Sequence, residues 1–148
     1  MKQVQPRIPL IARWHVLFGL AFAVFGMAVG IYMAISQNHV PHPAHAHIML
    51  LGFVVSVIYG VIYRLWPAEA PAMLATVQTV LHQIGATVLS IGLLLLFGGA
   101  ASEAQLEPLL ATGSFSAIAG AIIMLYQVVR AGQAQRVAAP DMLTPGQA

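Results

Sequence analysis

The sequence predicts an all-α integral membrane protein whose single domain is a bundle of four membrane-spanning helices. Of its 148 residues, 59% are hydrophobic and only 7% are charged, and the mean hydropathy is +0.85. Soluble domains carry about 25% charged residues, and a chain this short has no core large enough to bury so much apolar surface. Lipid must therefore be the solvent for most of the chain.

Four apolar stretches are each long enough to cross about 30 Å of hydrocarbon as a helix. The spans are expected near residues 14–35, 44–66, 72–97 and 106–129. A polar, proline-rich connection at 36–43, a proline-bounded turn at 67–71 and a connection with two glycines and two glutamates at 98–107 separate them. Beyond the fourth span the sequence becomes polar, so residues 131–148 are expected to form a flexible cytoplasmic tail.

The basic residues predict the orientation of the spans. All of them fall on one side of a four-span chain: Lys2, Arg7, Arg13, Arg64, Arg130 and Arg136. Because cytoplasmic connections are enriched in Lys and Arg, both termini are expected in the cytoplasm and the protein in the inner membrane of a prokaryote. The net charge of +2 without a basic cluster argues against nucleic-acid binding, and the absence of cysteine excludes disulfides and thiolate ligands.

Six histidines are many for a membrane chain, and several crowd the outer entrance of the second span. An ionisable side chain in a membrane is costly and marks a functional candidate, and neutral imidazole binds haem iron, copper and zinc. His45 and His47 point about 200° apart on a helix, so they cannot easily share one haem iron within it. They can serve two sites on opposite flanks, or one of them can simply form a hydrogen bond to a neighbouring helix.

One face of the second span is the expected cofactor-binding surface. Residues Met49, Gly52 and Ser56 follow His45 at i+4, i+7 and i+11. This face is bulky near His45 and small one turn deeper, which leaves room for the edge of a porphyrin. The alternative is plain packing, in which small residues let two helices approach closely.

His82 is expected deeper in the membrane than the outer histidines. It lies about 15 Å along the third span, too far in depth from His47 to share a metal with it unless the helices are offset. A hydrogen bond to a backbone carbonyl is the first expectation. A polar track with Gln78, Gln83 and Tyr59, or a role as a haem ligand, are the alternatives.

The remaining histidines allow less specific predictions. His15 lies beside Arg13 and Trp14 and is expected to be an interfacial anchor. His39 and His42 flank prolines in the outer connection, where they are either solvated or ligands of a copper or zinc site.

The segment 45–67 resembles subunit I of the haem–copper oxidase and nitric oxide reductase superfamily. In that family a helix that enters from the outer side opens with His-x-His or His-Gly-x-x-Met, and the histidine ligates haem. His45 and Met49 match the second form with Ala46 in place of glycine, and His45 with His47 matches the first. The resemblance implies haem b, with His45 and His47 as axial ligands of iron.

Family subunit I consists of three arcs of four helices, and this chain resembles one arc. The resemblance therefore implies a homotrimer with each haem between protomers, held by His45 from one and His47 from the next. The chain lacks the adjacent histidines that complete the family's copper site. Electron transfer or the handling of O2 or NO is thus expected, while catalysis and the redox partner stay open. The alternative function is a haem-free copper- or metal-binding membrane or assembly protein that uses the His39–His47 cluster.

Overall fold

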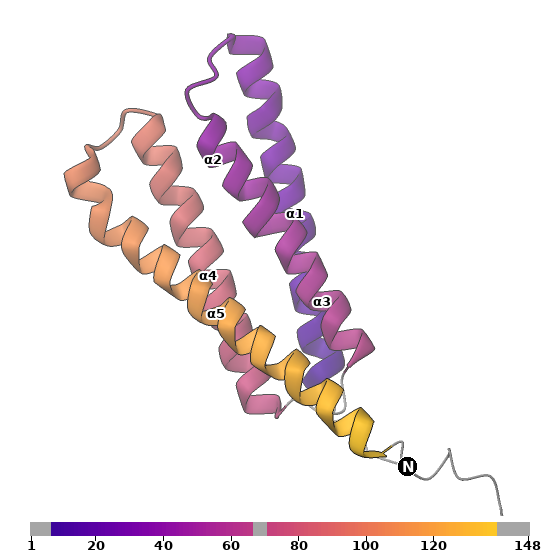
Figure 1. The fold of residues 1–148 in the computed structure, drawn as a ribbon. Helices are drawn as coiled ribbons and strands as arrows, with labels where there is room; N and C mark the ends of the chain where they lie inside the picture. Colours follow the sequence, from indigo (N-terminus) through magenta and orange to yellow (C-terminus); the bar gives the residue numbers. More distant parts are fainter. Residues whose placement is uncertain (1–6, 67–70, 139–148) are drawn as a thin grey trace, which may run out of the picture.

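The computed structural model describes residues 7–66 and 71–138, and in these residues the chain forms two helical hairpins (Figure 1). In the first hairpin, α1 (Arg7–Ser36) pairs with a long helix made of α2 (His42–His47), η1 (Ile48–Val55) and α3 (Ser56–Leu65). In the second, α4 (Ala72–Phe97) pairs with α5 (Glu103–Ala138). Figure 1 shows that the hairpins approach each other at one end and diverge toward the other.

The described residues contain four helical segments that are long and apolar enough to cross a membrane, which confirms the predicted all-helical class and the number of candidate spans. They are Ile8–Ser36, His42–Leu65, Ala72–Phe97 and Glu103–Gln133. Large apolar side chains cover their outer surfaces, and Ile35 and Met73 are each 80% exposed. So much exposed apolar surface is what a bilayer would cover.

Two helices are longer than the sequence predicts. The first helix begins at Arg7 rather than near residue 14, and α5 continues through Ala138 into the expected tail at 131–148. Hydropathy limits the membrane span but not the helix, because Arg, Gln and Ala are good helix formers in water as well. The rest of the predicted tail, residues 139–148, lies outside the described residues.

Prolines begin α2 and α4, and glycines end α4. Pro41 and Pro71 are the residues at the N-caps of α2 and α4, where the missing N–H group costs no intrahelical hydrogen bond. At the other end of α4 the chain leaves the helix through Gly98 and Gly99. Gly99 has a φ of 72°, a left-handed conformation that glycine adopts without steric cost.

The middle of the second span is a π-helix. It extends from Ile48 to Val55 and begins directly after His47. A π-helix closes its hydrogen bonds between residues five apart, so the angular spacing of an α-helix does not hold through it. Such segments are rare and frequently lie at functional sites.

Small residues bring the backbones of α4 and α5 into contact. A β-carbon on Gly85 would lie 2.6 Å from the backbone nitrogen of Ala117, and one on Gly113 would lie 2.8 Å from that of Leu89. Real β-carbons do not approach backbone atoms so closely. Gly85 and Gly113 therefore serve close packing of the two helices.

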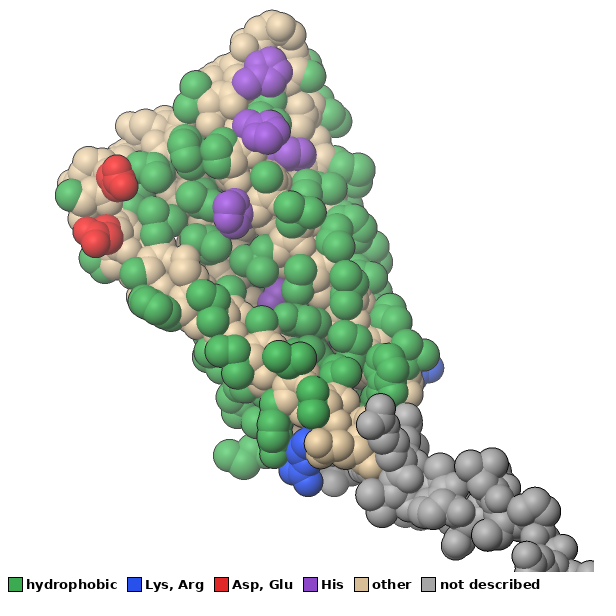
Figure 2. Space-filling model, viewed as in Figure 1, with side chains coloured by type: hydrophobic (Ala, Val, Ile, Leu, Met, Phe, Trp, Pro, Cys, Tyr) green, Lys and Arg blue, Asp and Glu red, His purple; other side chains and the backbone are tan. Residues whose placement is uncertain are grey.

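The apolar core lies where the two hairpins converge. All four spans contribute to it through Ile8, Ile11, Ala12, Tyr59, Tyr63, Ala75 and Met124. Figure 2 shows Lys and Arg side chains at this end of the molecule, which we call the basic end. The opposite end, with the 36–43 connection, is called the histidine end.

Candidate functional site

Histidine side chains form a column on one face of the molecule, from the histidine end toward its middle (Figure 2). His39, His42 and His47 are exposed, and His45 is half-buried. Among the described residues, no group of three or more His, Cys, Asp or Glu side chains could hold a metal ion. The copper or zinc site suggested by His39 and His42 therefore stays a prediction from the sequence.

The side chain of His45 packs against α1, and a backbone carbonyl of α1 orients its ring. Its Nδ1 lies 3.0 Å from the carbonyl oxygen of Gly26, and a β-carbon on Gly30 would be 3.2 Å from its Cε1. Because a carbonyl oxygen can only accept, Nδ1 must carry the proton and donate it. The lone pair of a neutral His45 is therefore on Nε2.

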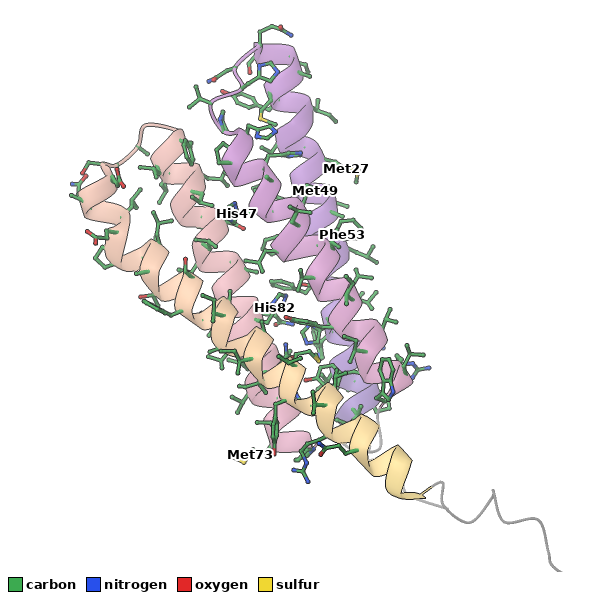
Figure 3. All side chains as sticks on the ribbon, in the orientation of Figure 1. Met27, His47, Met49, Phe53, Met73 and His82 are labelled. Atoms are coloured by element: carbon green, nitrogen blue, oxygen red, sulfur yellow. The ribbon has the colours of Figure 1, made fainter. Side chains whose placement is uncertain are left out.

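His47 has the same arrangement on the exposed surface. Its Nδ1 donates to the carbonyl oxygen of Pro43 at 2.8 Å, so its lone pair is also on Nε2. A surface cavity of about 190 Å³ lies against it, lined by Ala46, His47, Leu50 and Leu51. Figure 3 places His47 nearer the histidine end than His82.

These two imidazoles share one feature of metal-ligating histidines. Histidines that ligate metals almost always donate the second ring N–H to a carbonyl, carboxylate or water, which fixes the ring and its tautomer. His45 and His47 both do so. They lie on the α-helical segment α2, so they point about 200° apart and cannot easily converge on one iron within a chain.

The face predicted to admit a porphyrin edge packs against α1 instead. A β-carbon on Gly52 would overlap the ring of Phe22, and Met49 fills the space over Gly26. Ser56 is completely buried. The room expected on this face is therefore taken by side chains of the same hairpin, and the expectation of an open cofactor surface there is wrong.

A second constellation, the buried polar cluster, lies between all four spans. Its members are His15 of α1, Ser56 and Tyr63 of α3, Gln78, Thr79 and His82 of α4, and Gln127 of α5. Each of these residues is buried. Burying polar groups is costly unless they pair, and each of these residues has at least one hydrogen bond to another member of the cluster. Among the described residues, Nδ1 of His15, Nε2 of Gln78, Nδ1 of His82 and Oε1 of Gln127 have no partner.

Hydrogen bonds link this cluster across the helices. The Tyr63 hydroxyl donates to Oε1 of Gln78 at 3.0 Å and accepts from Nε2 of Gln127 at 3.1 Å. On α4, Nε2 of His82 lies 2.8 Å from the hydroxyl oxygen of Ser56. Tyr63 is thus the point where α3, α4 and α5 are joined.

The tautomer of His15 follows from its neighbours. Its Nε2 lies 3.2 Å from Oε1 of Gln78 and 3.0 Å from Oγ1 of Thr79. The Thr79 hydroxyl already donates to the carbonyl of Ala75 at 2.8 Å, so toward His15 it can only accept. The His15 proton is therefore on Nε2, and α1 is joined to α4 by a donated hydrogen bond.

The predicted role of His15 is wrong. It is fully buried, whereas its neighbour Trp14 is 56% exposed and occupies the surface position. Since α1 begins at Arg7, His15 lies two turns inside the helix and faces α4 rather than the membrane interface.

The predictions for His82 are confirmed only in part. It bonds a side chain, Ser56, rather than a backbone carbonyl. Two members of the expected polar track do lie near His82. The ring centroids of Tyr59 and His82 are 4.8 Å apart, and Gln78 belongs to the same buried polar cluster. Gln83 is half-buried and makes none of the cluster's hydrogen bonds.

Sequence reasoning missed Tyr63, Thr79 and Gln127 as cluster members. A signal was present, because Gln78 and His82 are four residues apart on one helix, as are Tyr59 and Tyr63. Residues at that spacing share a helix face. Polar residues at such a spacing on two apolar helices predict that the two faces meet.

Comparisons with known proteins identify no relative: no protein-family model, curated protein or solved structure matches the chain. The resemblance of segment 45–67 to oxidase subunit I therefore stays a prediction from the sequence.

Proposed function

We propose that this chain is a b-type haem-binding membrane protein for electron transfer or the handling of O2 or NO, with His45 and His47 as axial ligands. The observation that carries the proposal is the shared orientation of the two rings. Each donates from Nδ1 to a backbone carbonyl and keeps its lone pair on Nε2, the arrangement of a metal-ligating histidine. Haem supplies one-electron redox chemistry, and two histidine ligands favour electron transfer over gas activation.

The haem would lie between protomers of a homotrimer. The face of the second span that looks toward α1 is filled by Phe22 and its neighbours, so a porphyrin must approach from outside the single chain. His47 is exposed next to a surface cavity, and extensive apolar surface surrounds the spans. Because the two rings point in different directions, each protomer would give the exposed His47 to one neighbour and the half-buried His45, which packs against α1, to the other through Nε2.

Haem content is the direct test of this proposal. Protein purified in detergent should show a Soret band and sharp reduced α and β bands. His45→Ala and His47→Ala should each remove most of the bound haem, because one axial bond is lost. His42→Ala is the matched control, since this exposed histidine of the same segment is not expected to bind iron. A colourless parent protein, or two variants that keep their haem, would contradict the proposal.

Co-expression distinguishes ligands from two chains from ligands within one. Neither His45→Ala nor His47→Ala can form a complete site by itself. In a mixed trimer, one interface joins the intact His45 of one variant to the intact His47 of the other, so haem should return in part. Isolation through two different affinity tags selects the mixed assemblies. No recovery, despite mixed assemblies being isolated, would show that the site is not shared between chains.

A further inference from the structure

A groove at the basic end combines two arginines with apolar walls. Its volume is about 260 Å³, and it is lined by Pro9, Ala12, Arg13, Val16, Leu17 and Arg64. Both arginines are exposed, one on α1 and the other near the end of α3. Neither the haem proposal nor the buried polar cluster uses this surface.

Close packing of α1 and α3 holds the two arginines on neighbouring helices. A β-carbon on Gly60 would lie 2.8 Å from Cγ2 of Val16 and 3.0 Å from the carbonyl oxygen of Ala12. The helices therefore touch directly beside the groove. The positions of Arg13 and Arg64 are set by this contact rather than by a flexible connection.

The charge of the groove is positive, and its position suits the edge of a bilayer. The acidic residues of the described chain, Glu103 and Glu107, are on α5 near the start of that helix, far from the basic end (Figure 2). A tryptophan neighbours each arginine in sequence, Trp14 beside Arg13 and Trp66 close to Arg64. Tryptophan is enriched at the depth of lipid headgroups.

We infer that the groove binds an anionic phospholipid. Guanidinium groups bind phosphate oxygens through paired hydrogen bonds, so Arg13 and Arg64 would hold the phosphodiester. Val16 and Leu17 line the part of the groove further along α1, where they would contact an acyl chain. Basic pockets between membrane helices bind acidic headgroups in this way, and the apolar wall favours a lipid over a soluble anion.

Quenching of Trp14 fluorescence tests this inference. The Trp66→Phe variant leaves Trp14 as the sole tryptophan. It is reconstituted into vesicles of phosphatidylcholine and phosphatidylglycerol, with brominated acyl chains on one lipid or the other. An arginine near the membrane surface favours anionic lipid by about fivefold, so brominated phosphatidylglycerol should quench more strongly at equal mole fraction.

Variants separate a lipid site from general attraction to a charged surface. Arg13→Gln with Arg64→Gln should abolish the preference for phosphatidylglycerol. Arg130→Gln is the matched control and should keep it, because this exposed arginine contacts Tyr126 outside the groove. Equal quenching by both lipids in the parent, or a preference that survives the double substitution, would overturn the inference. The same comparison is made at one ionic strength, set with chloride or with inorganic phosphate, because salt alone screens exposed charges. A preference that is kept in chloride and abolished in phosphate would show that free phosphate occupies the groove as readily as lipid, and would also overturn the inference.

Discussion

Replacing Gly85 by alanine should lower the free energy of unfolding by about 1–2 kcal/mol. The new methyl group would meet the backbone of Ala117, with its nitrogen 2.6 Å and its Cα 2.9 Å from the β-carbon. Backbone atoms cannot rotate away, so α4 and α5 must move apart, and overpacking of this kind costs about 1–3 kcal/mol. The gain in helix propensity from Gly to Ala is about 0.5–1 kcal/mol and offsets only part of that cost.

Two glycines of α5 provide a second test and a control for this prediction. Gly113→Ala should destabilise similarly, because its β-carbon would lie 2.8 Å from the backbone nitrogen of Leu89. Gly132→Ala is the control, since no atom lies within 4 Å of its β-carbon and only the propensity gain remains. Reversible unfolding in mixed detergent and SDS, followed by circular dichroism, measures all three. Equal stability of Gly85→Ala and Gly132→Ala would show that the two backbones do not touch.

Replacing Tyr63 by phenylalanine should cost about 1–2 kcal/mol of stability. The substitution removes one oxygen without changing the shape of the ring. That oxygen donates to Gln78 and accepts from Gln127, so two hydrogen bonds between helices are lost. Side-chain hydrogen bonds in membrane proteins contribute about 0.6 kcal/mol on average and up to about 1.7 kcal/mol each. The effect should lie toward the upper part of the range, because the substitution leaves the buried amide nitrogen Nε2 of Gln127 without the hydroxyl that accepts its hydrogen bond.

Tyr126→Phe supplies the matched comparison for this change. It removes the same atom from an exposed tyrosine of α5, whose hydroxyl accepts a hydrogen bond from Arg130 at 3.3 Å and from no other residue that the structure describes. Removing an exposed hydroxyl leaves no buried polar group without a partner. The free energy of unfolding of this variant should therefore stay within about 0.5 kcal/mol of that of the parent. Equal free energies of unfolding for Tyr63→Phe and Tyr126→Phe would show that the Tyr63 hydroxyl does not hold α3, α4 and α5 together.

The helices themselves were predictable because their signals are local. Long apolar runs set the candidate spans, and Pro41 and Pro71 mark the starts of two helices. The start of α1 and the end of α5 lie beyond the predicted spans. Hydropathy indicates where a chain would enter lipid, but it does not indicate where the hydrogen bonding of a helix ends. The π-helix from Ile48 to Val55 carried no signal in the sequence, since it depends on how the second span fits its neighbours.

The two groups of histidines differ in how far sequence reasoning reached. For His45 and His47, the two-residue spacing on a helix was enough to predict that the rings diverge, and α2 keeps them on a regular helix. For His15, its neighbours in sequence suggested the interface. Its hydrogen bonds to Gln78 and Thr79, residues far along the chain, bury it instead.

By itself, the sequence determined the all-helical class, the number of candidate spans and the crowding of histidines at one end, because composition and short-range spacing control these features. Only the tertiary structure decided which polar side chains meet. His15, Tyr63, His82 and Gln127 come from four separate spans, and their contacts depend on how those helices rotate against each other. The same packing closed the face at Gly52 to a cofactor by placing Phe22 over it. Helix rotation is set by contacts between distant residues, so the four-residue spacing of Gln78 and His82 marks a polar face on one helix but does not say which side chains of the other helices meet it.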